Sequence, residues 1–362
     1  MNNIHMEQYG AGPRFLGEAT LYTGEIPARV VSQSRDLYRV VCEEGFLAAE
    51  VSGKFRFETK YLSDYPAVGD FVMLDRSNDE NGNAIIHHLL TRKSAFIRKA
   101  AGTAGEEQVV AANIDVVFLC MALNRDFNLR RMERYLAVAW DSGATPVIVL
   151  TKADLCDDVE ARLRETETVA PGVEILVSSS VEKDGYLKVM EYIRPGQTVA
   201  LMGSSGVGKS TLINCLLGEE RITTKGLRND DKGKHTTTKR ELFLLPNGGL
   251  VIDTPGMREL GLESADLGKA FSDIDALAAQ CRFRDCTHGA EPGCAVRKAL
   301  EEGSLSSERL ENYFKLKKEA RYEGLNFREI ESTKMEEMFR DVGGMKNARR
   351  LVKEKTKRRE GR

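Results

Sequence analysis

The chain has 362 residues, a length that predicts two or three domains rather than one. Its 41% hydrophobic and 30% charged residues exclude a disordered chain, and its longest apolar runs, such as residues 114–123, are about half of the roughly 20 residues needed to cross a bilayer. The formal net charge of -2 gives no whole-chain argument for nucleic acid binding.

The amino-terminal part of the chain predicts a small β-barrel. Its first ten residues, MNNIHMEQYG, lack the apolar core of a secretion signal, so we expect a cytoplasmic protein. Short β-rich runs separated by Gly, Asn and Asp then follow: ATLYTG (19–24), ARVVSQ (28–33), LYRVVCEE (37–44), FLAAEVSG (46–53), DFVMLD (70–75) and AIIHHLL (84–90). About five strands in roughly 75 residues favour an antiparallel OB-like barrel, to which we assign residues 1–99.

A basic segment leads from this barrel into a predicted linker. The sequence of residues 91–108, TRKSAFIRKAAGTAGEEQ, changes from basic to small and polar, and we place the domain boundary there. OB-like barrels often bind oligonucleotides, although a fold alone does not establish function. Four cations at this boundary could contribute charge to such binding: Arg92, Lys93, Arg98 and Lys99.

Residues 100–272 predict an α/β domain of the P-loop GTPase type. Apolar strands are expected within residues 114–123, 145–154, 173–180 and 198–202, and amphipathic helices within 128–143 and 186–193. Nearly continuous apolar strands that alternate with helices indicate a mostly parallel sheet covered on both faces.

A candidate base-binding turn, Thr151-Lys152-Ala153-Asp154, follows the strand PVIVL. The carboxylate of Asp154 can accept hydrogen bonds from guanine N1–H and from the exocyclic amine, and adenine offers no such pair of donors. Lys152 would lay its methylene stem against the base, while Ser178 and Ser179 would support the guanine carbonyl through a backbone N–H. Taken alone, TKAD is also compatible with an exposed turn.

A phosphate site is predicted at Gly203-Ser204-Ser205-Gly206-Val207-Gly208-Lys209-Ser210, which fits the P-loop pattern. The strand TVALM precedes it, and the helix-like TLINCLLG, beginning at Thr211, follows. The glycines let backbone N–H groups close around phosphate, and the helix presents its positive N-terminus. We expect Lys209 to reach the β and γ phosphates and Ser210 to hold Mg²⁺.

Two further segments complete the predicted phosphate site. Asp253-Thr254-Pro255-Gly256 ends the apolar strand GLVI, where Asp253 can act on Mg²⁺ and the N–H of Gly256 can meet the γ-phosphate. The polar segment KGLRNDDKGKHTTTKRE (225–241) is where a mobile loop would bring a threonine to Mg²⁺. The candidates are Thr236, Thr237 and Thr238, of which we select Thr237.

Three cysteines and a histidine form a predicted metal site, Cys281-x4-Cys286-x-His288-x5-Cys294. Soft ligands in a Cys₃His set suit tetrahedral Zn²⁺, and four protein ligands leave no open position for a catalytic water. The site should therefore be structural. The other cysteines read as small buried hydrophobes of a reducing cytosol: Cys42, Cys120, Cys156 and Cys215.

Residues 273–362 are assigned to a zinc-binding helical module with a basic tail. The segment SERLENYFKLKKEARYE (307–323) has helical spacing, with four apolar side chains on roughly one side: Leu310, Tyr313, Phe314 and Leu316. The tail KNARRLVKEKTKRREGR (346–362) and the arginines near the zinc loop are either a solvated charged face or contacts to RNA phosphates: Arg282, Arg284 and Arg297.

The order of these motifs resembles one family of GTPases. TKAD, SSS, GSSGVGKS, HTTT and DTPG follow each other with the base motif before the P-loop, the reverse of ordinary GTPases, between a barrel and a Cys/His cluster. From about Gly17 to Tyr322 the chain is similar to the ribosome small-subunit-dependent GTPase A family (RsgA). Permutation keeps the ligand crevice at the carboxyl ends of the strands.

The resemblance implies a function as well as a fold. It implies hydrolysis of GTP to GDP and phosphate, binding of the small ribosomal subunit and its ribosomal RNA through the barrel and the zinc module, and a role late in subunit maturation. It also implies stimulation by the subunit and names Cys281, Cys286, His288 and Cys294 as zinc ligands. We expect no membrane association and a monomer.

Two residues depart from the usual GTPase pattern. Thr151 replaces the usual Asn of the base motif, which bears on nucleotide affinity more than on base preference. Met257 stands where many GTPases carry the glutamine that orients the attacking water. The resemblance implies a hydrophobic-substituted GTPase with slow intrinsic turnover. His235 is the candidate to position water, unless it is a solvated loop histidine or a partner supplies the group.

Two other functions remain open from the sequence. The first is a zinc-stabilised RNA-binding module that binds nucleotide but hardly hydrolyses it, for which Met257 is the argument. The second is an ATPase of another assembly, in which Asp154 would not select the base.

Overall fold

The computed structural model describes residues 4–34, 36–78, 80, 82–99, 106–179, 181–182, 185–222, 240–253, 267–289 and 291–322. The chain forms two compact units, Met1–Leu316 and Lys317–Arg362, and every described element except the end of the last helix lies in the first. Within the described ranges, no helix is both long and apolar enough to cross a membrane.

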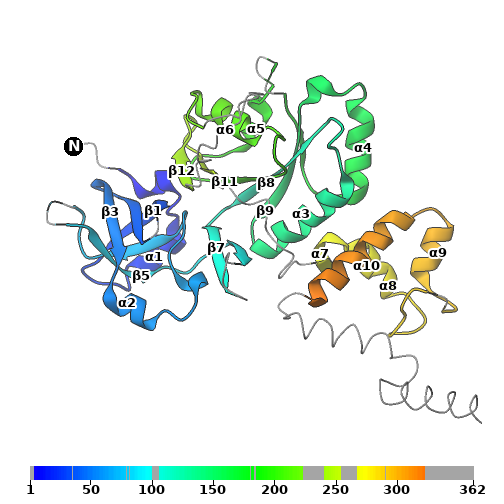
Figure 1. Cartoon of the computed structure of the whole chain (residues 1–362), viewed down its shortest axis with the longest axis horizontal. Coiled ribbons are helices and arrows are strands. Elements are labelled where there is room, and N and C mark those ends of the chain that lie inside the picture. The colour runs from blue at the N-terminus through cyan, green and yellow to red at the C-terminus, as the bar shows by residue number, and fades with distance from the viewer. Residues whose placement is uncertain are drawn as a thin grey trace, which may run out of the picture. The chain divides into compact units, whose positions relative to one another are not determined.

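Five strands close the amino-terminal barrel (Figure 1). They are β1 (Ile26–Ser34), β2 (Leu37–Cys42), β3 (Gly45–Val51), β4 (Phe71–Leu74) and β5 (Ala84–Leu89). Their order is β1-β2-β3-β5-β4, with β4 pairing back to β1, and only β3 and β5 run parallel. This connectivity agrees with the predicted five-stranded OB-like barrel. Its interior is a separate apolar core that includes Val30, Val40 and Leu74.

The first of the predicted β-rich runs, residues 19–24, is not a strand. It follows helix α1 (Pro13–Ala19), which begins with a proline at the position where a missing N–H is tolerated. Thr20 ends the helix, since its hydroxyl donates to Gly17 O at 2.7 Å. Leu21 is 76% exposed, so the run offers no buried strand face. The other short helices of this part are η1 (Met6–Tyr9), α2 (Gly53–Glu58) and η2 (Leu62–Asp64).

A pair of strands flanks the predicted linker. β6 (Ala95–Lys99) and β7 (Glu107–Ala112) pair antiparallel on either side of residues 100–105, which lie outside the described residues. Phe96 and Val110 are buried in the core of the following domain. The sequence analysis did not predict either strand, and the position of the domain boundary stays a prediction.

The central domain is built on the predicted sheet. Its strands are β8 (Val116–Ala122), β9 (Thr145–Thr151), β10 (Ile175–Val177), β11 (Thr198–Met202), β12 (Glu241–Leu244) and β13 (Leu250–Asp253). They are ordered β10-β9-β8-β11-β13-β12, all parallel except β12, which runs antiparallel to β13. A single pair, Ser32 with Glu241, continues this sheet into β1 of the barrel.

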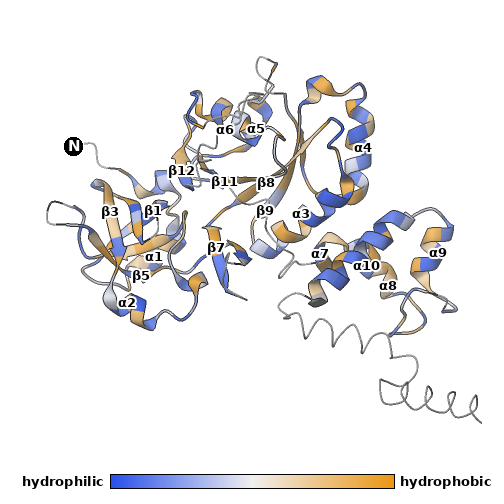
Figure 2. Ribbon diagram, in the orientation of Figure 1, coloured by the Kyte–Doolittle hydropathy of each residue, from blue (hydrophilic) through white to orange (hydrophobic). Residues whose placement is uncertain are grey.

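Helices cover both faces of this sheet. In Figure 2 the strands are mainly hydrophobic in colour, whereas the helices carry both hydrophobic and hydrophilic residues. They are α3 (Leu129–Ser142), η3 (Ala153–Leu155), α4 (Val159–Val169), α5 (Leu187–Tyr192) and α6 (Lys209–Leu217). Along β8, Val117 and Leu119 pack with α3 and α4, whereas Phe118 and Cys120 pack with α5 and α6. This alternation explains why the strand is apolar on both sides.

The carboxyl-terminal described elements are helical. They are α7 (Leu267–Ala270), α8 (Ser272–Ala278), α9 (Ala295–Glu301) and α10 (Ser307–Tyr322). Leu310, Tyr313 and Leu316 of α10 are buried, as predicted, together with Phe271 and Val296. Phe314 was assigned to the same side, but it is 40% exposed because the buried side of the helix follows a spacing of three residues.

Candidate functional site

The predicted nucleotide-binding segments follow the ends of neighbouring parallel strands. The turn 151–154 follows β9, the P-loop follows β11, and Asp253 ends β13. Since these strands are parallel members of one sheet, their carboxyl ends lie at the same edge. Ligands of open α/β sheets bind at this edge.

The P-loop backbone depends on its glycines and turns directly into α6. A side chain at Gly203 would place its Cβ 2.5 Å from Cys120 O, and Gly206 has a φ of 74°. Lys209 is the first residue of α6, and its Nζ donates to Gly203 O at 2.6 Å and Ser204 O at 2.7 Å. Ser205 and Gly208 lie in the turn between, while Ser210 and Thr211 form the first turn of the helix. The ammonium thus lies against the loop that is expected to enclose phosphate.

Thr151 connects the base turn to the P-loop. Its hydroxyl is buried and donates to Val207 O at 2.6 Å, with Met121 O at 3.4 Å as a second acceptor. The departure from Asn therefore still provides a polar side chain that reaches across to the phosphate loop. This contact joins β9 to the loop that follows β11.

The residues predicted to recognise the base lie close together. Ser179 Oγ donates to Asp154 Oδ1 at 2.7 Å, and Ala153 N donates to Ser178 O at 3.3 Å. Lys152 has a left-handed backbone, with φ of 57°, at the start of η3. Ser178 Oγ is buried and has no hydrogen-bond partner among the described residues.

An aspartate that the sequence did not single out holds the P-loop from the other side. Ser204 Oγ donates to Asp126 Oδ2 at 2.7 Å, and the guanidinium of Arg131 donates to both carboxylate oxygens of Asp126 at 2.9 and 3.0 Å. The hydrogen bonds from Arg131 and Ser204 hold the pKa of Asp126 below its ordinary value. No sequence signal marks Asp126, which reads as a loop acid before a helix.

Asp253 lies where the sequence predicted a magnesium-binding carboxylate. Burial raises its pKa, and the positive charge of Lys209 opposes that rise. A divalent cation at this place would favour the ionised carboxylate in the same way. The residues present therefore suit a phosphate-bound Mg²⁺.

Several predicted site residues lie outside the described residues. They are His235, Thr236, Thr237 and Thr238 of the polar segment, and Thr254, Pro255, Gly256 and Met257 after β13. Their roles stay predictions.

The four predicted zinc ligands form one cluster. Their ligand atoms all lie within 4.8 Å of one another: Cys281, Cys286, His288 and Cys294. The sulfurs of Cys281 and Cys294 are 3.8 Å apart, and His288 Nδ1 lies 3.6 and 3.5 Å from them. Tetrahedral zinc with Zn–S bonds of about 2.3 Å places sulfurs roughly 3.8 Å apart, so the residues fit this ion. Cys294 also caps α9 by accepting from Arg297 N.

Two of the basic residues predicted to contribute to RNA binding are engaged within the protein. Arg92 donates to both carboxylate oxygens of the buried Asp70, and Lys93 contacts Asp115 at 2.5 Å. Their charge serves internal ion pairs. Arg98 donates to Gln108, and the side chain of Lys99 lies outside the described part of the structure.

Comparisons with known proteins agree with this arrangement. A sequence model of the RsgA GTPase family matches residues 89–263. The chain is 48% identical to Small ribosomal subunit biogenesis GTPase RsgA 2 of Lactiplantibacillus plantarum, over 97% of this chain and 98% of the relative. It is also 48% identical to the protein of the same name from Listeria monocytogenes, over 88% and 90%.

Two solved structures are similar in fold. YjeQ from Thermotoga maritima is 29% identical with a TM-score of 0.60, covering 82% of this chain and 98% of that one. YloQ, described as a circularly permuted GTPase, is 23% identical with a TM-score of 0.60, covering 84% and 98%.

Proposed function

The chain belongs to the RsgA family of circularly permuted GTPases, and we propose that it hydrolyses GTP in a crevice between the P-loop and the base turn 151–154. The observation that carries the proposal is the bond from Thr151 to Val207 O, which ties the base turn to the phosphate loop. Asp154, held by Ser179, then faces one end of a nucleotide whose phosphates occupy the other.

Each described residue has one role in this proposal. Lys209 and the backbone N–H groups of the P-loop bind the β and γ phosphates, and Asp154 reads guanine. Ser210 and Asp253 would hold Mg²⁺, which supplies positive charge to the phosphate oxygens. Lys152 lies along the base.

The residues that we expect to position the attacking water and to contact the γ-phosphate lie outside the described residues. We assign Thr237 to Mg²⁺, the N–H of Gly256 to the γ-phosphate and His235 to water. Since Met257 offers no hydrogen bond, intrinsic turnover should be slow.

We also assign the biological partner from the relatives. Their names describe biogenesis of the small ribosomal subunit, and for this chain we propose binding to that subunit late in its maturation. Stimulated hydrolysis would then report correct docking. A monomeric, cytoplasmic protein suits this role.

One surface of the barrel supports an RNA partner. Phe57 and Tyr61 are 91% and 66% exposed, on and just after α2. The same short segment carries three cations: Lys54, Arg56 and Lys60. Exposed aromatic rings can stack on unpaired bases while cations neutralise phosphates, whereas an aromatic ring in open water gains nothing. The arginines of the zinc loop would add phosphate contacts.

The proposal is tested by measuring GTP and ATP hydrolysis with and without purified small ribosomal subunits. We expect GTP-selective turnover that rises with subunits and is lost in Lys209→Ala. Turnover that subunits leave unchanged would remove the ribosomal role and keep the enzyme. A Phe57→Ala/Tyr61→Ala variant should lose stimulation but keep basal turnover.

A further inference from the structure

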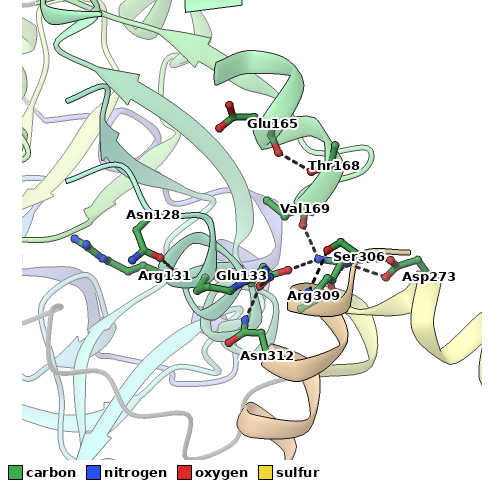
Figure 3. A network of polar contacts seen from close by, with 12 residues as sticks. Asn128, Arg131, Glu133, Glu165, Thr168, Val169, Asp273, Ser306, Arg309 and Asn312 are labelled. Carbon is green, nitrogen blue, oxygen red and sulfur yellow. Dashed lines mark hydrogen bonds and ion pairs between the residues drawn. The ribbon is translucent and has the colours of Figure 1, made fainter. Parts of the chain in front are cut away.

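Arg309 of α10 is a buried arginine that joins its own helix to α3, α4, α7 and α8 (Figure 3). Its guanidinium donates to Glu133 Oε1 at 2.6 Å and to both oxygens of Asp273 at 2.8 and 2.9 Å. It also reaches Ala270 O at 3.1 Å and Val169 O at 3.5 Å. The side chain is 5% exposed, so few of these bonds are shared with water. A planar fork is needed to satisfy acceptors in several directions, which a lysine cannot do.

Glu133 of α3 is the main acceptor of this network. Its side chain is completely buried, and it accepts from Arg309, from Asn312 Nδ2 at 2.5 Å and from Arg130 at 3.2 Å. A buried carboxylate is rare unless it is paired. Two of its three partners come from α10, so the start of α3 is held in place by the carboxyl-terminal helices.

The same turn of α3 is connected to the P-loop through Asp126, which precedes the helix. Asn128 caps the helix by accepting from Arg131 N at 3.0 Å. The side chain of Arg131 binds Asp126, and Asp126 accepts from the hydroxyl of Ser204 in the P-loop. Arg131 and Glu133 are two positions apart in the same helix, so a shift of this helical turn moves both contacts together.

We propose that Arg309 is a positioning residue for the nucleotide site, acting through the first turn of α3 on Asp126 and Ser204 of the P-loop. This inference rests on the proposed nucleotide site. The zinc-bearing helices thereby set how tightly the P-loop binds nucleotide, in addition to any contact they make with a partner.

The physical argument is that the link is short and rigid. Arg309 contacts Glu133, and Glu133 lies two positions from Arg131 in α3. Arg131 contacts Asp126, which in turn contacts Ser204. Every side chain in it has a defined partner, and a helix changes position as a unit rather than residue by residue. Coupling between sites needs such a continuous set of contacts together with a measurable effect on both ends.

The test is a double-mutant cycle on the affinity for a fluorescent GDP analogue. The full chain carries Arg309→Lys, Ser204→Ala or both changes. We expect Arg309→Lys to weaken binding between about two- and thirtyfold. In the Ser204→Ala background, where α3 no longer holds the loop, Arg309→Lys should change the affinity by less than about twofold. A general loss of stability would not produce this non-additivity.

Arg76→Lys is the matched control, since Arg76 pairs with Asp75 on the barrel. This variant should bind nucleotide like the natural chain. Zinc content and far-UV circular dichroism show that each variant is folded. If Arg309→Lys does not fold, Asn312→Ala removes the second α10 donor to Glu133, and the same cycle applies.

Two results would overturn the proposal: unchanged affinity in folded Arg309→Lys or Asn312→Ala, and an equal loss in both backgrounds. Lys209→Ala separates these from a failure of the site itself. If Lys209→Ala binds nucleotide like the natural chain, the P-loop assignment is wrong. If it abolishes binding and Arg309→Lys has no effect, only the link through α3 is wrong.

Discussion

At the scale of single residues, two hydroxyl groups fix the P-loop to its neighbours. Thr151, at the end of β9, donates to Val207 O of the loop. Ser204 of the loop donates to Asp126, which follows β8. Each bond connects the loop to a different strand end. The loop is therefore held on both sides, which reduces the ordering that nucleotide binding must impose.

Thr151→Val tests the first of these bonds, since it keeps the shape of the side chain and removes the donor. Loss of one hydrogen bond costs about 0.5–1.5 kcal/mol, so we expect nucleotide affinity to fall about 2- to 13-fold. Titration with a fluorescent GDP analogue measures the change. Thr151→Ser keeps the hydroxyl and should bind like the natural chain. Equal affinities for the Val and Ser variants would show that the bond has no such role.

Asp154→Asn tests base selection. The carboxylate accepts two hydrogen bonds from guanine, each worth about 1.5–3 kcal/mol to a charged group, so GTP affinity should fall by about a hundredfold or more. The amide introduces a donor that matches the 2-carbonyl of xanthine, and affinity for xanthosine triphosphate should rise. Asp157→Asn, three residues further on and exposed, should change neither. Unaltered GTP binding in Asp154→Asn would place the base elsewhere.

Residues with a recognisable chemical pattern could be predicted from the sequence, and residues defined by long-range contacts could not. The four predicted zinc ligands could be selected because their types and spacing carry the chemistry, and the structure brings all four together. Arg309 and Glu133 are charged residues of a kind that usually faces solvent on a helix. Only tertiary packing buries them against each other. Phe314 shows the opposite case, since its spacing placed it on the same side as Leu310 and Tyr313, yet it is 40% exposed.

At the scale of elements, the parallel strands were predictable because both of their faces are covered and their sequences are apolar throughout. β6 and β7 were not predicted because β6 ends in Arg98 and Lys99, and small residues follow them. The described carboxyl-terminal helices pack around Phe271, Tyr313 and Leu316, next to the cysteine cluster, and Ala137 of α3 completes this core.

Removal of zinc should therefore unfold this core. Structural zinc sites contribute about 10–16 kcal/mol of apparent binding free energy in small domains, and Cys281 and Cys286 pack directly on the helices. We expect one zinc per chain, and loss of both zinc and the corresponding thermal transition in Cys281→Ser. Cys215→Ser, a cysteine outside the cluster, is the control and should keep one zinc. A zinc-free Cys281→Ser with an unchanged melting temperature would contradict a structural site.

The ion pair of Asp273 with Arg309 gives the helical part a predictable acid response. Burial alone would raise the pKa of Asp273, but the hydrogen bonds and charge of Arg309 lower it below the ordinary value of about 3.9. Because the folded-state pKa is depressed, the pair stabilises above about pH 4 and is lost as pH falls below that value.

Asp273→Asn measures this contribution. The side chain of Asp273 is 38% exposed, so solvent screening limits the expected loss to about 1 kcal/mol at pH 7. Urea unfolding of both proteins at pH 7 and near pH 3 should show that this difference shrinks in acid. A difference that is the same at both pH values would mean that ionisation of Asp273 does not stabilise the fold.

At the scale of the whole molecule, one arginine joins the barrel to the nucleotide-binding sheet. Arg29 of β1 is 1% exposed and donates to Tyr9 O, Gly69 O and Asn113 O, and to Thr198 Oγ1 on β11. Burial lowers its pKa to about 10, so it still carries its charge at neutral pH. The barrel and the sheet share this side chain as well as the pair between β1 and β12.

We therefore expect the barrel and the sheet to unfold together, and Arg29→Met to separate them. The substitution keeps an apolar stem but leaves several buried acceptors without a donor, and breaking a buried charged network of this kind costs about 3–5 kcal/mol. Calorimetry should then resolve the shared transition of the barrel and the sheet into two. Arg39→Met, on the exposed side of the neighbouring strand β2, should keep a single transition. If Arg29→Met melts in one step at a lower temperature, the two parts are held together by the surrounding apolar contacts, and Arg29 adds stability without linking them.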